Sequence, residues 1–279
     1  MKKFIILTIA VFTGVISFAQ THSCCSAPEQ FASLGNDMAF VNAHDAPIPF
    51  HFVSNKGNMM TYHCSDGKDA NAFAIMAKEK TDNYVFVVHE WWGLNDYIKQ
   101  ISEQIYNDLG EKVNVIALDL YDGKVAATPD SAKSIMKGLD QQRANTIITS
   151  LIEHVGPAAK VATIGWCMGG GYSLQATIAL KQNGVGCIMY YGMPEADISK
   201  LQQINGEVLM MWANQDKWIK KETVDQFKTN METAGKKLKV EEYAADHAFA
   251  NPSNPKYNKE LADDAYQKSI RFLKQIFSL

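Results

Sequence analysis

The stretch that most constrains this chain is Val161–Gly171, which reads Val-Ala-Thr-Ile-Gly-Trp-Cys-Met-Gly-Gly-Gly. Its apolar, β-branched start predicts a strand, and the residues from 172 to 180 predict a helix. Cys167 therefore stands at the apex of a strand–turn–helix unit, where small neighbours let strand and helix approach each other. Such a turn raises a nucleophilic side chain above the edge of a sheet. A buried cysteine in a glycine-rich turn is also common packing, so the motif needs support from elsewhere.

The rest of the chain alternates between short apolar runs and segments with helical spacing. Strands are predicted at 58–64, 71–78, 84–88, 113–118, 161–165, 185–191, 208–213 and 238–243, and helices at 97–109, 131–154 (broken near Gly138), 172–180, 221–234 and 259–277. The first two strands form a hairpin. This alternation predicts the α/β class: a doubly wound, mostly parallel sheet with helices on both faces, over residues 58–279. Ligands of such sheets bind at the carboxyl ends of the strands.

The N-terminus has the features of a secretory signal peptide over residues 1–20. Lys2 and Lys3 precede an apolar run, and small residues lead to a cleavage point near Ala19 or Gln20. The run is short for a transmembrane helix, so we expect cleavage, no stable membrane span afterwards, and a periplasmic or secreted location. An uncleaved anchor is the alternative. Residues 21–57 have no clear periodicity and many turn residues, which predicts an extended N-terminal arm.

Charge and cysteine content limit the partners. The net charge is −3 with no long basic run, which argues against nucleic acid as a partner, and we expect a monomer. The five cysteines are Cys24, Cys25, Cys64, Cys167 and Cys187. An odd number leaves at least one thiol free after export. Two roles are open for Cys24 or Cys25: one of them forms a disulfide with Cys64, or one of them binds a metal together with His22. The spacing matches no strong metal motif, so no metal or other cofactor is predicted.

Titratable residues follow three of the predicted strands. Glu90 comes after the strand at 84–88, Asp216 after the strand at 208–213, and His247 after the strand at 238–243. With Cys167, the chain order is nucleophile, acid, histidine, as in α/β-hydrolases. Each residue alone has an ordinary structural explanation, and it is their joint placement at strand ends that favours a catalytic site.

This set of residues predicts nucleophilic catalysis. Cys167 attacks as a thiolate, His247 takes its proton, and Asp216 orients the imidazole. The backbone N–H groups of Met168 and Trp91 are the candidate oxyanion hole. Asp246 and His89 compete for the roles of acid and base. Asp246 adjoins the histidine in sequence, and His89 lies on the other side of the nucleophile in chain order.

Several motifs in this order resemble those of the dienelactone hydrolase family. They are His-Glu-Trp-Trp-Gly-Leu-Asn at 89–95, Asp-Leu-Tyr at 119–121, Gly-Trp-Cys-Met-Gly-Gly at 165–170, Tyr-Tyr-Gly at 190–192 and Asp-His-Ala-Phe at 246–249. The resemblance runs from about Met59 to the C-terminus and implies an α/β-hydrolase fold with Cys167, Asp216 and His247 as the triad. It also implies that Glu90 contacts the resting cysteine and that substrate binding reorganises this pair.

The family's substrate motifs are only partly present. Two arginines that bind the substrate carboxylate in classical members are replaced, one within Asp122-Gly123-Lys124 and the other at Ala250-Asn251. Lysine lacks the planar fork of arginine, so Lys124 is a partial substitute. We therefore expect a small, uncharged ester, lactone or thioester as substrate rather than dienelactone. The predicted substrate contacts are Trp92, Tyr121, Lys124, Tyr191 and Asn251.

Two other functions remain alternatives at this point. One is a non-catalytic exported binding protein that kept the scaffold, because a fold alone does not establish a function. The other is a thiol-redox or metal-handling role centred on Cys24 and Cys25.

Overall fold

An eight-stranded sheet forms the centre of the protein, which is represented by a computed structural model describing residues 26–254 and 256–279. The proposed signal peptide, Cys24 and Cys25 lie outside the described residues. The strand order is β1-β2-β4-β3-β5-β6-β7-β8. The strands are β1 (Asn58–His63), β2 (Asp69–Ile75), β3 (Asn83–Val88), β4 (Asn114–Leu118), β5 (Lys160–Trp166), β6 (Gly184–Tyr190), β7 (Glu207–Ala213) and β8 (Leu238–Tyr243).

Pairing is antiparallel at one edge and parallel across the rest. β1 pairs with β2, and β2 with β4, in antiparallel register, whereas β4, β3, β5, β6, β7 and β8 run parallel. The five residues of β4 are all buried, because a parallel strand is covered on both faces. The predicted α/β class and mostly parallel sheet are thereby confirmed.

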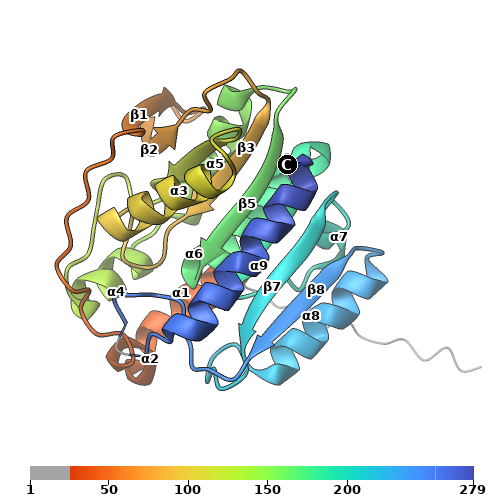
Figure 1. The fold of residues 1–279 in the computed structure, drawn as a ribbon. Helices are drawn as coiled ribbons and strands as arrows, with labels where there is room; N and C mark the ends of the chain where they lie inside the picture. The colour runs from red at the N-terminus through yellow and green to blue at the C-terminus, as the bar shows by residue number, and fades with distance from the viewer. Residues whose placement is uncertain (1–25, 255) are drawn as a thin grey trace, which may run out of the picture.

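Helices cover both faces of the sheet (Figure 1). They are α3 (Asp96–Asp108), α4 (Pro129–Lys137), α5 (Gln141–Val155), α6 (Met168–Leu180), α7 (Ile198–Leu201), α8 (Lys221–Thr233) and α9 (Lys259–Phe277). Helices α3 and α9 lie in front of the sheet in Figure 1, and Tyr266 of α9 donates a hydrogen bond to Asp108 of α3 at 2.7 Å. On the opposite face, Leu174 of α6 and Phe227 of α8 pack in one apolar cluster with Met189 of β6.

The N-terminal arm is not extended throughout. Helix α1 (Ala27–Ser33), a 3₁₀ turn η1 (Leu34–Asn36) and α2 (Met38–Asn42) precede an irregular segment that runs to β1. A capping box between Ser26 and Glu29 starts α1, and the Asp37 side chain caps α2. These helices lie where the strands β5 and β7 end (Figure 1). Helices this short are weak signals in a sequence, and the prediction of an extended arm missed them.

Among the residues that the structure describes, no helix combines the length and the apolar character that a membrane crossing requires.

Candidate active site

Cys167 lies at the sharp turn between β5 and α6, with a backbone φ of 58° and ψ of −121°. A positive φ is strained for a residue with a side chain, so the surrounding packing has to maintain it. A Cβ atom on Gly165 would lie 2.1 Å from the carbonyl oxygen of Gly169, and one on Gly169 would lie 2.4 Å from that of Val88. Strand and helix come this close only because both positions lack a side chain.

His247 lies between Cys167 and Asp216. Its Nδ1 atom is 2.6 Å from Oδ2 of Asp216, and its Nε2 atom is 3.4 Å from Sγ of Cys167. The other carboxylate oxygen of Asp216 accepts hydrogen bonds from the backbone N–H groups of Trp218 and Ile219, at 2.8 and 3.0 Å. Burial would raise the pKa of Asp216, but His247 and these N–H groups outweigh it, and the pKa lies below its ordinary value. The carboxylate is thus held in its ionised form.

The competing acid and base are engaged elsewhere. His89 donates from Nδ1 to the carbonyl oxygen of Glu90 at 2.6 Å, and its Nε2 accepts from the N–H of Leu120 at 3.1 Å. Asp246 forms an ion pair with Lys256 at 3.1 Å. Both ring nitrogens of His89 are therefore occupied by backbone groups.

The thiol of Cys167 is held protonated in the resting protein. Burial, followed by the neighbouring carboxylate of Glu90, raises its pKa well above the ordinary value. The backbone N–H groups of Met168 and Trp91 donate hydrogen bonds to the sulfur, and these bonds lower the pKa of the thiol. The two N–H groups predicted as an oxyanion hole therefore converge on the reactive atom.

Glu90 lies next to this sulfur and is itself buried. Its Oε2 atom accepts a hydrogen bond of 2.5 Å from Nδ2 of Asn251. Burial raises the pKa of Glu90 to about 8, so its neutral form is favoured at neutral pH. No direct hydrogen bond joins the Glu90 carboxyl to Cys167 in the part of the chain that the structure describes.

Side chains of α2 and of the segment that follows it cover His247. The ring of Phe40 lies 5.8 Å from that of His247, and the ring of His44 lies 5.4 Å from it. Trp218 packs against Phe40 at 5.1 Å and donates a hydrogen bond to Asp37 at 2.9 Å. Under this cover Cys167 is 1% exposed and His247 4% exposed. Burial raises the cost of protonating His44 and lowers its pKa to about 3, so its ring is neutral.

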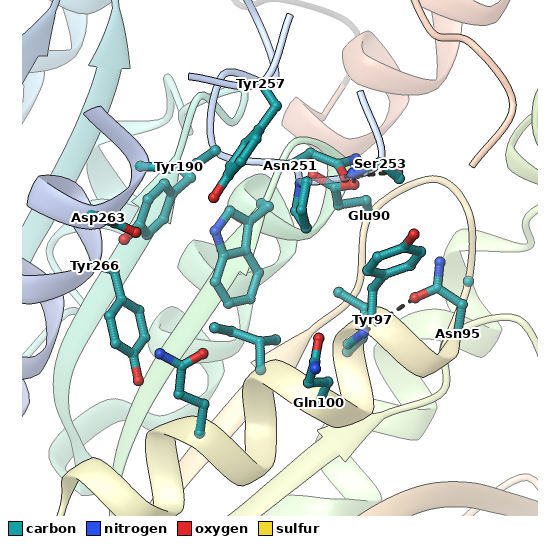
Figure 2. A pocket seen from close by; sticks show the side chains of 18 residues that line it. Glu90, Asn95, Tyr97, Gln100, Tyr190, Asn251, Ser253, Tyr257, Asp263 and Tyr266 are labelled. Carbon is teal, nitrogen blue, oxygen red and sulfur yellow. Dashed lines mark hydrogen bonds between the residues drawn. The ribbon is translucent and has the colours of Figure 1, made fainter. Parts of the chain in front are cut away.

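A cavity of about 260 Å³ opens on the other side of Glu90 (Figure 2). Figure 2 shows Glu90 and Asn251 on one side of it and Tyr190 and Tyr266 on the opposite side. Its lining comes from the ends of β5 and β6, from the loop after β3, from α3, from the loop before α9 and from α9 itself. None of the described residues that line it is a lysine or an arginine.

The five predicted substrate contacts are separated in space. Only Asn251 lines the cavity. Trp92 is buried against Trp91 at 4.9 Å, and Lys124 is exposed at the surface. Tyr121 donates a hydrogen bond to Sδ of Met168 at 3.1 Å, and the ring of Tyr191 lies 5.0 Å from that of His247.

Three buried side-chain atoms in the described residues have no hydrogen-bond partner: Nε2 of His44, Nε1 of Trp91 and the hydroxyl oxygen of Tyr191. All three belong to residues packed around His247 or the sulfur of Cys167. Unsatisfied buried polar groups are rare and gather where a ligand completes them. His44, Phe40 and Trp218 were not predicted as site residues, because they carry no spacing or motif relative to Cys167.

The other two cysteines among the described residues are free thiols. Cys187 is buried in β6, and Cys64 is buried as well. Cys24 and Cys25 lie outside the described residues, so the alternative in which one of them pairs with Cys64 stays a prediction.

Comparisons with known proteins match most of the chain. The model of the dienelactone hydrolase family matches residues 71–277. A relative from Saccharolobus solfataricus named "Putative carboxymethylenebutenolidase" is 28% identical, over 77% of this chain and 97% of its own. "Protein usf" from Aquifex pyrophilus is 25% identical, over 68% and 87%. The solved structure of a dienelactone hydrolase-like promiscuous phosphotriesterase from metagenomic libraries has a TM-score of 0.67 at 19% identity, over 80% of this chain and 99% of its own.

Proposed function

This chain belongs to the dienelactone hydrolase family and is an ester or lactone hydrolase, and we propose that it works through a Cys167–His247–Asp216 triad. The observation that carries the proposal is the position of the His247 ring, 3.4 Å from the sulfur on one side and 2.6 Å from the carboxylate on the other. A nucleophile, a base within reach of it and an acid that orients the base are the parts that acyl transfer needs.

The proposed reaction has two halves. Sγ of Cys167 attacks the carbonyl carbon as its proton moves to Nε2 of His247, and the N–H groups of Met168 and Trp91 stabilise the oxyanion. The leaving alcohol, or thiol, takes that proton as its bond to the acyl carbon breaks, which leaves an acyl-cysteine. His247 then takes a proton from water, the hydroxide attacks the acyl carbon, and the acid departs as the thiol is restored.

Glu90 has the role of holding the thiol inactive between turnovers. Burial already raises the pKa of Cys167, and in its ionised form the Glu90 carboxylate raises this pKa further, which keeps the thiol protonated. Release of the pair when substrate binds activates the nucleophile. A protonated thiol in a residue that is only 1% exposed is also protected from oxidation, which suits an exported enzyme.

The substrate class follows from the charges around the cavity. No lysine or arginine occurs among its described lining residues, and Lys124 is exposed and is not one of them. Asp263 contributes a carboxylate to the lining, which would repel a substrate carboxylate, whereas the buried carboxyl group of Glu90 is neutral at neutral pH. We therefore propose an uncharged ester, lactone or thioester with an apolar or hydroxylated group that fits among Tyr97, Tyr190 and Tyr266.

The protein is further proposed to act in the periplasm or outside the cell, after cleavage of residues 1–20. The intact mass of the mature protein recovered from an expressing bacterium tests this. Loss of about the first 20 residues from the exported fraction is expected, and an intact N-terminus in that fraction would contradict it.

The decisive experiment measures hydrolysis of a short-chain aryl ester by the wild type, Cys167→Ala and Cys187→Ala. Cys187 is the matched control, because it is also a buried free thiol but lies within strand β6 and not at the turn after β5. We expect kcat/KM to fall by at least about 1,000-fold in the first variant and by little in the second. Equal activity of the wild type and a folded Cys167→Ala protein would refute the proposed nucleophile.

A further inference from the structure

Three metal-ligating side chains meet beside the proposed nucleophile. One ligand atom each from His44, Cys167 and His247 lies within 4.8 Å of the other two. His44 comes from the segment after α2, which lies before the region matched by the family model. The cluster therefore contains a ligand that the catalytic residues do not include.

The His44 ring presents a free lone pair. Its Nδ1 atom is 2.7 Å from the carbonyl oxygen of Phe40, and a carbonyl oxygen can only accept, so Nδ1 carries the proton. Nε2 is then unprotonated, buried, and without a hydrogen-bond partner among the described residues. A buried acceptor with nothing to accept is costly, and a bound cation would satisfy it.

His247 has the same arrangement. Its Nδ1 faces the carboxylate of Asp216 at 2.6 Å, and its Nε2 faces the sulfur of Cys167 at 3.4 Å. Imidazoles that bind zinc almost always donate their other N–H to a carboxylate or a backbone carbonyl, which fixes the ring. Both partner types are present here, the carbonyl for His44 and the carboxylate for His247.

We propose that His44, Cys167 and His247 form a binding site for zinc, or for a similarly soft divalent ion. The bound ion reversibly inhibits the enzyme by occupying the side chains of the active site. Two imidazole nitrogens and one thiolate are a ligand set that favours zinc over magnesium or calcium. The site itself does not depend on the proposed hydrolase function, whereas its inhibitory effect rests on it.

The distances suit tetrahedral zinc. With Zn–N of about 2.1 Å and Zn–S of about 2.3 Å, tetrahedral ligand atoms lie roughly 3.4–3.7 Å apart. The Nε2–Sγ distance of 3.4 Å already matches, and the remaining separations, within 4.8 Å, need to shrink by about 1.4 Å at most. The thiol proton leaves to solvent as the Zn–S bond forms, and a water molecule takes the fourth position.

Zinc in this position would use the same atoms as catalysis. Sγ of Cys167 and the Nε2 lone pair of His247 would both be bound to the ion, so neither acylation nor proton transfer could begin. Inhibition is therefore expected to be complete at saturation and reversed by a chelator, because no covalent bond to carbon forms.

The test is metal binding to the full chain with Cys24→Ser and Cys25→Ser, which removes the thiols outside the described residues. Zinc affinity is measured against a chromophoric chelator, and cobalt serves as a spectroscopic substitute that reports thiolate coordination by a charge-transfer band. We expect about one tight equivalent of metal and a cobalt–thiolate band that disappears in Cys167→Ser.

His44→Phe is the critical variant, because phenylalanine suits the aromatic surroundings of Phe40 and Trp91. It is expected to weaken zinc binding by at least about 100-fold. His44→Gln serves as a second variant if the first does not fold. His51→Phe is the control, since the His51 side chain is 84% exposed, and it should bind zinc like the parent protein.

The outcomes separate this proposal from the hydrolase. Equal zinc affinity in the parent and a folded His44→Phe or His44→Gln protein would overturn the zinc site, even if ester hydrolysis is robust. Tight binding that requires His44 and Cys167 in a protein without esterase activity would support the site and count against the proposed hydrolase mechanism. Hydrolysis that is inhibited by zinc in the parent, restored by chelator and resistant in His44→Phe supports both.

Discussion

Replacing Glu90 by glutamine should change how the stability of the protein depends on pH. Glu90 is buried, and its pKa rises from 4.5 to about 8 on folding. Between its unfolded and folded pKa values, a carboxyl group whose pKa is raised on folding binds more protons in the folded protein than in the unfolded chain. Its contribution to the free energy of unfolding is therefore complete below the unfolded pKa and is lost as the pH rises to the folded pKa. Wild-type stability should therefore decrease from about pH 4.5 to about pH 8 through this one group.

The magnitude follows from the two pKa values. A pKa difference of one unit between the folded and the unfolded chain corresponds to about 1.4 kcal/mol. The rise of the Glu90 pKa from 4.5 to about 8 therefore corresponds to about 5 kcal/mol. Between pH 5 and pH 8 the expected loss is about 3–4 kcal/mol. Glutamine at position 90 stays neutral and can still accept the hydrogen bond from Asn251, so the variant should not show this loss.

Urea unfolding of the wild type and Glu90→Gln at pH 5 and pH 8 provides the test. Other titrating groups contribute to both proteins, so the quantity of interest is the difference between their free energies of unfolding. This difference should shift in favour of the variant by about 3–4 kcal/mol from pH 5 to pH 8. A difference that is the same at both pH values would refute the reasoning that burial keeps Glu90 neutral.

Three further substitutions test the site and its scaffold. Asp216→Asn should lower kcat/KM for an aryl ester by about 1,000- to 10,000-fold, since an amide cannot hold the imidazole in the required tautomer; an undiminished rate would remove the aspartate from the triad. Gly165→Ala should cost about 3 kcal/mol, because its Cβ would lie 2.1 Å from the backbone oxygen of Gly169. Thermal unfolding should show this as a decrease of about 6 °C or more, and an unchanged melting temperature would mean that strand and helix can separate. Phe40→Ala removes a buried ring beside His247, at a cost of about 3–5 kcal/mol. Alkylation of Cys167 by iodoacetamide should become faster in that variant, and an equal rate would mean that the N-terminal helices do not limit access to the sulfur.

Much of the fold could be predicted because its signals are local. Buried parallel strands such as β4 are continuous apolar runs, and α3 shows helical spacing. The break predicted near Gly138 is the boundary between α4 and α5. The short helices α1 and α2 were missed, since five to seven residues carry too little periodicity to distinguish them from a loop.

The candidate site was predictable for the same reason, up to a limit. Cys167, Asp216 and His247 each follow a recognisable strand, and the parallel sheet brings such positions to one edge. Among the predicted substrate contacts, Trp92 and Lys124 were chosen by their place in motifs. A motif does not encode which way a side chain points. In the structure Trp92 is buried and Lys124 is exposed.

The sequence by itself determined the order of strands and helices, the glycine-flanked turn at Cys167 and the chain order of the three catalytic candidates. These features depend on backbone preferences and side-chain alternation within a few residues. Only the tertiary structure decided that His44 and Phe40 cover His247 and that a cavity without lysine or arginine among its described residues lies beyond Glu90. Such contacts join segments far apart in the chain, and they form because distant apolar and aromatic surfaces exclude water together, which no local pattern records.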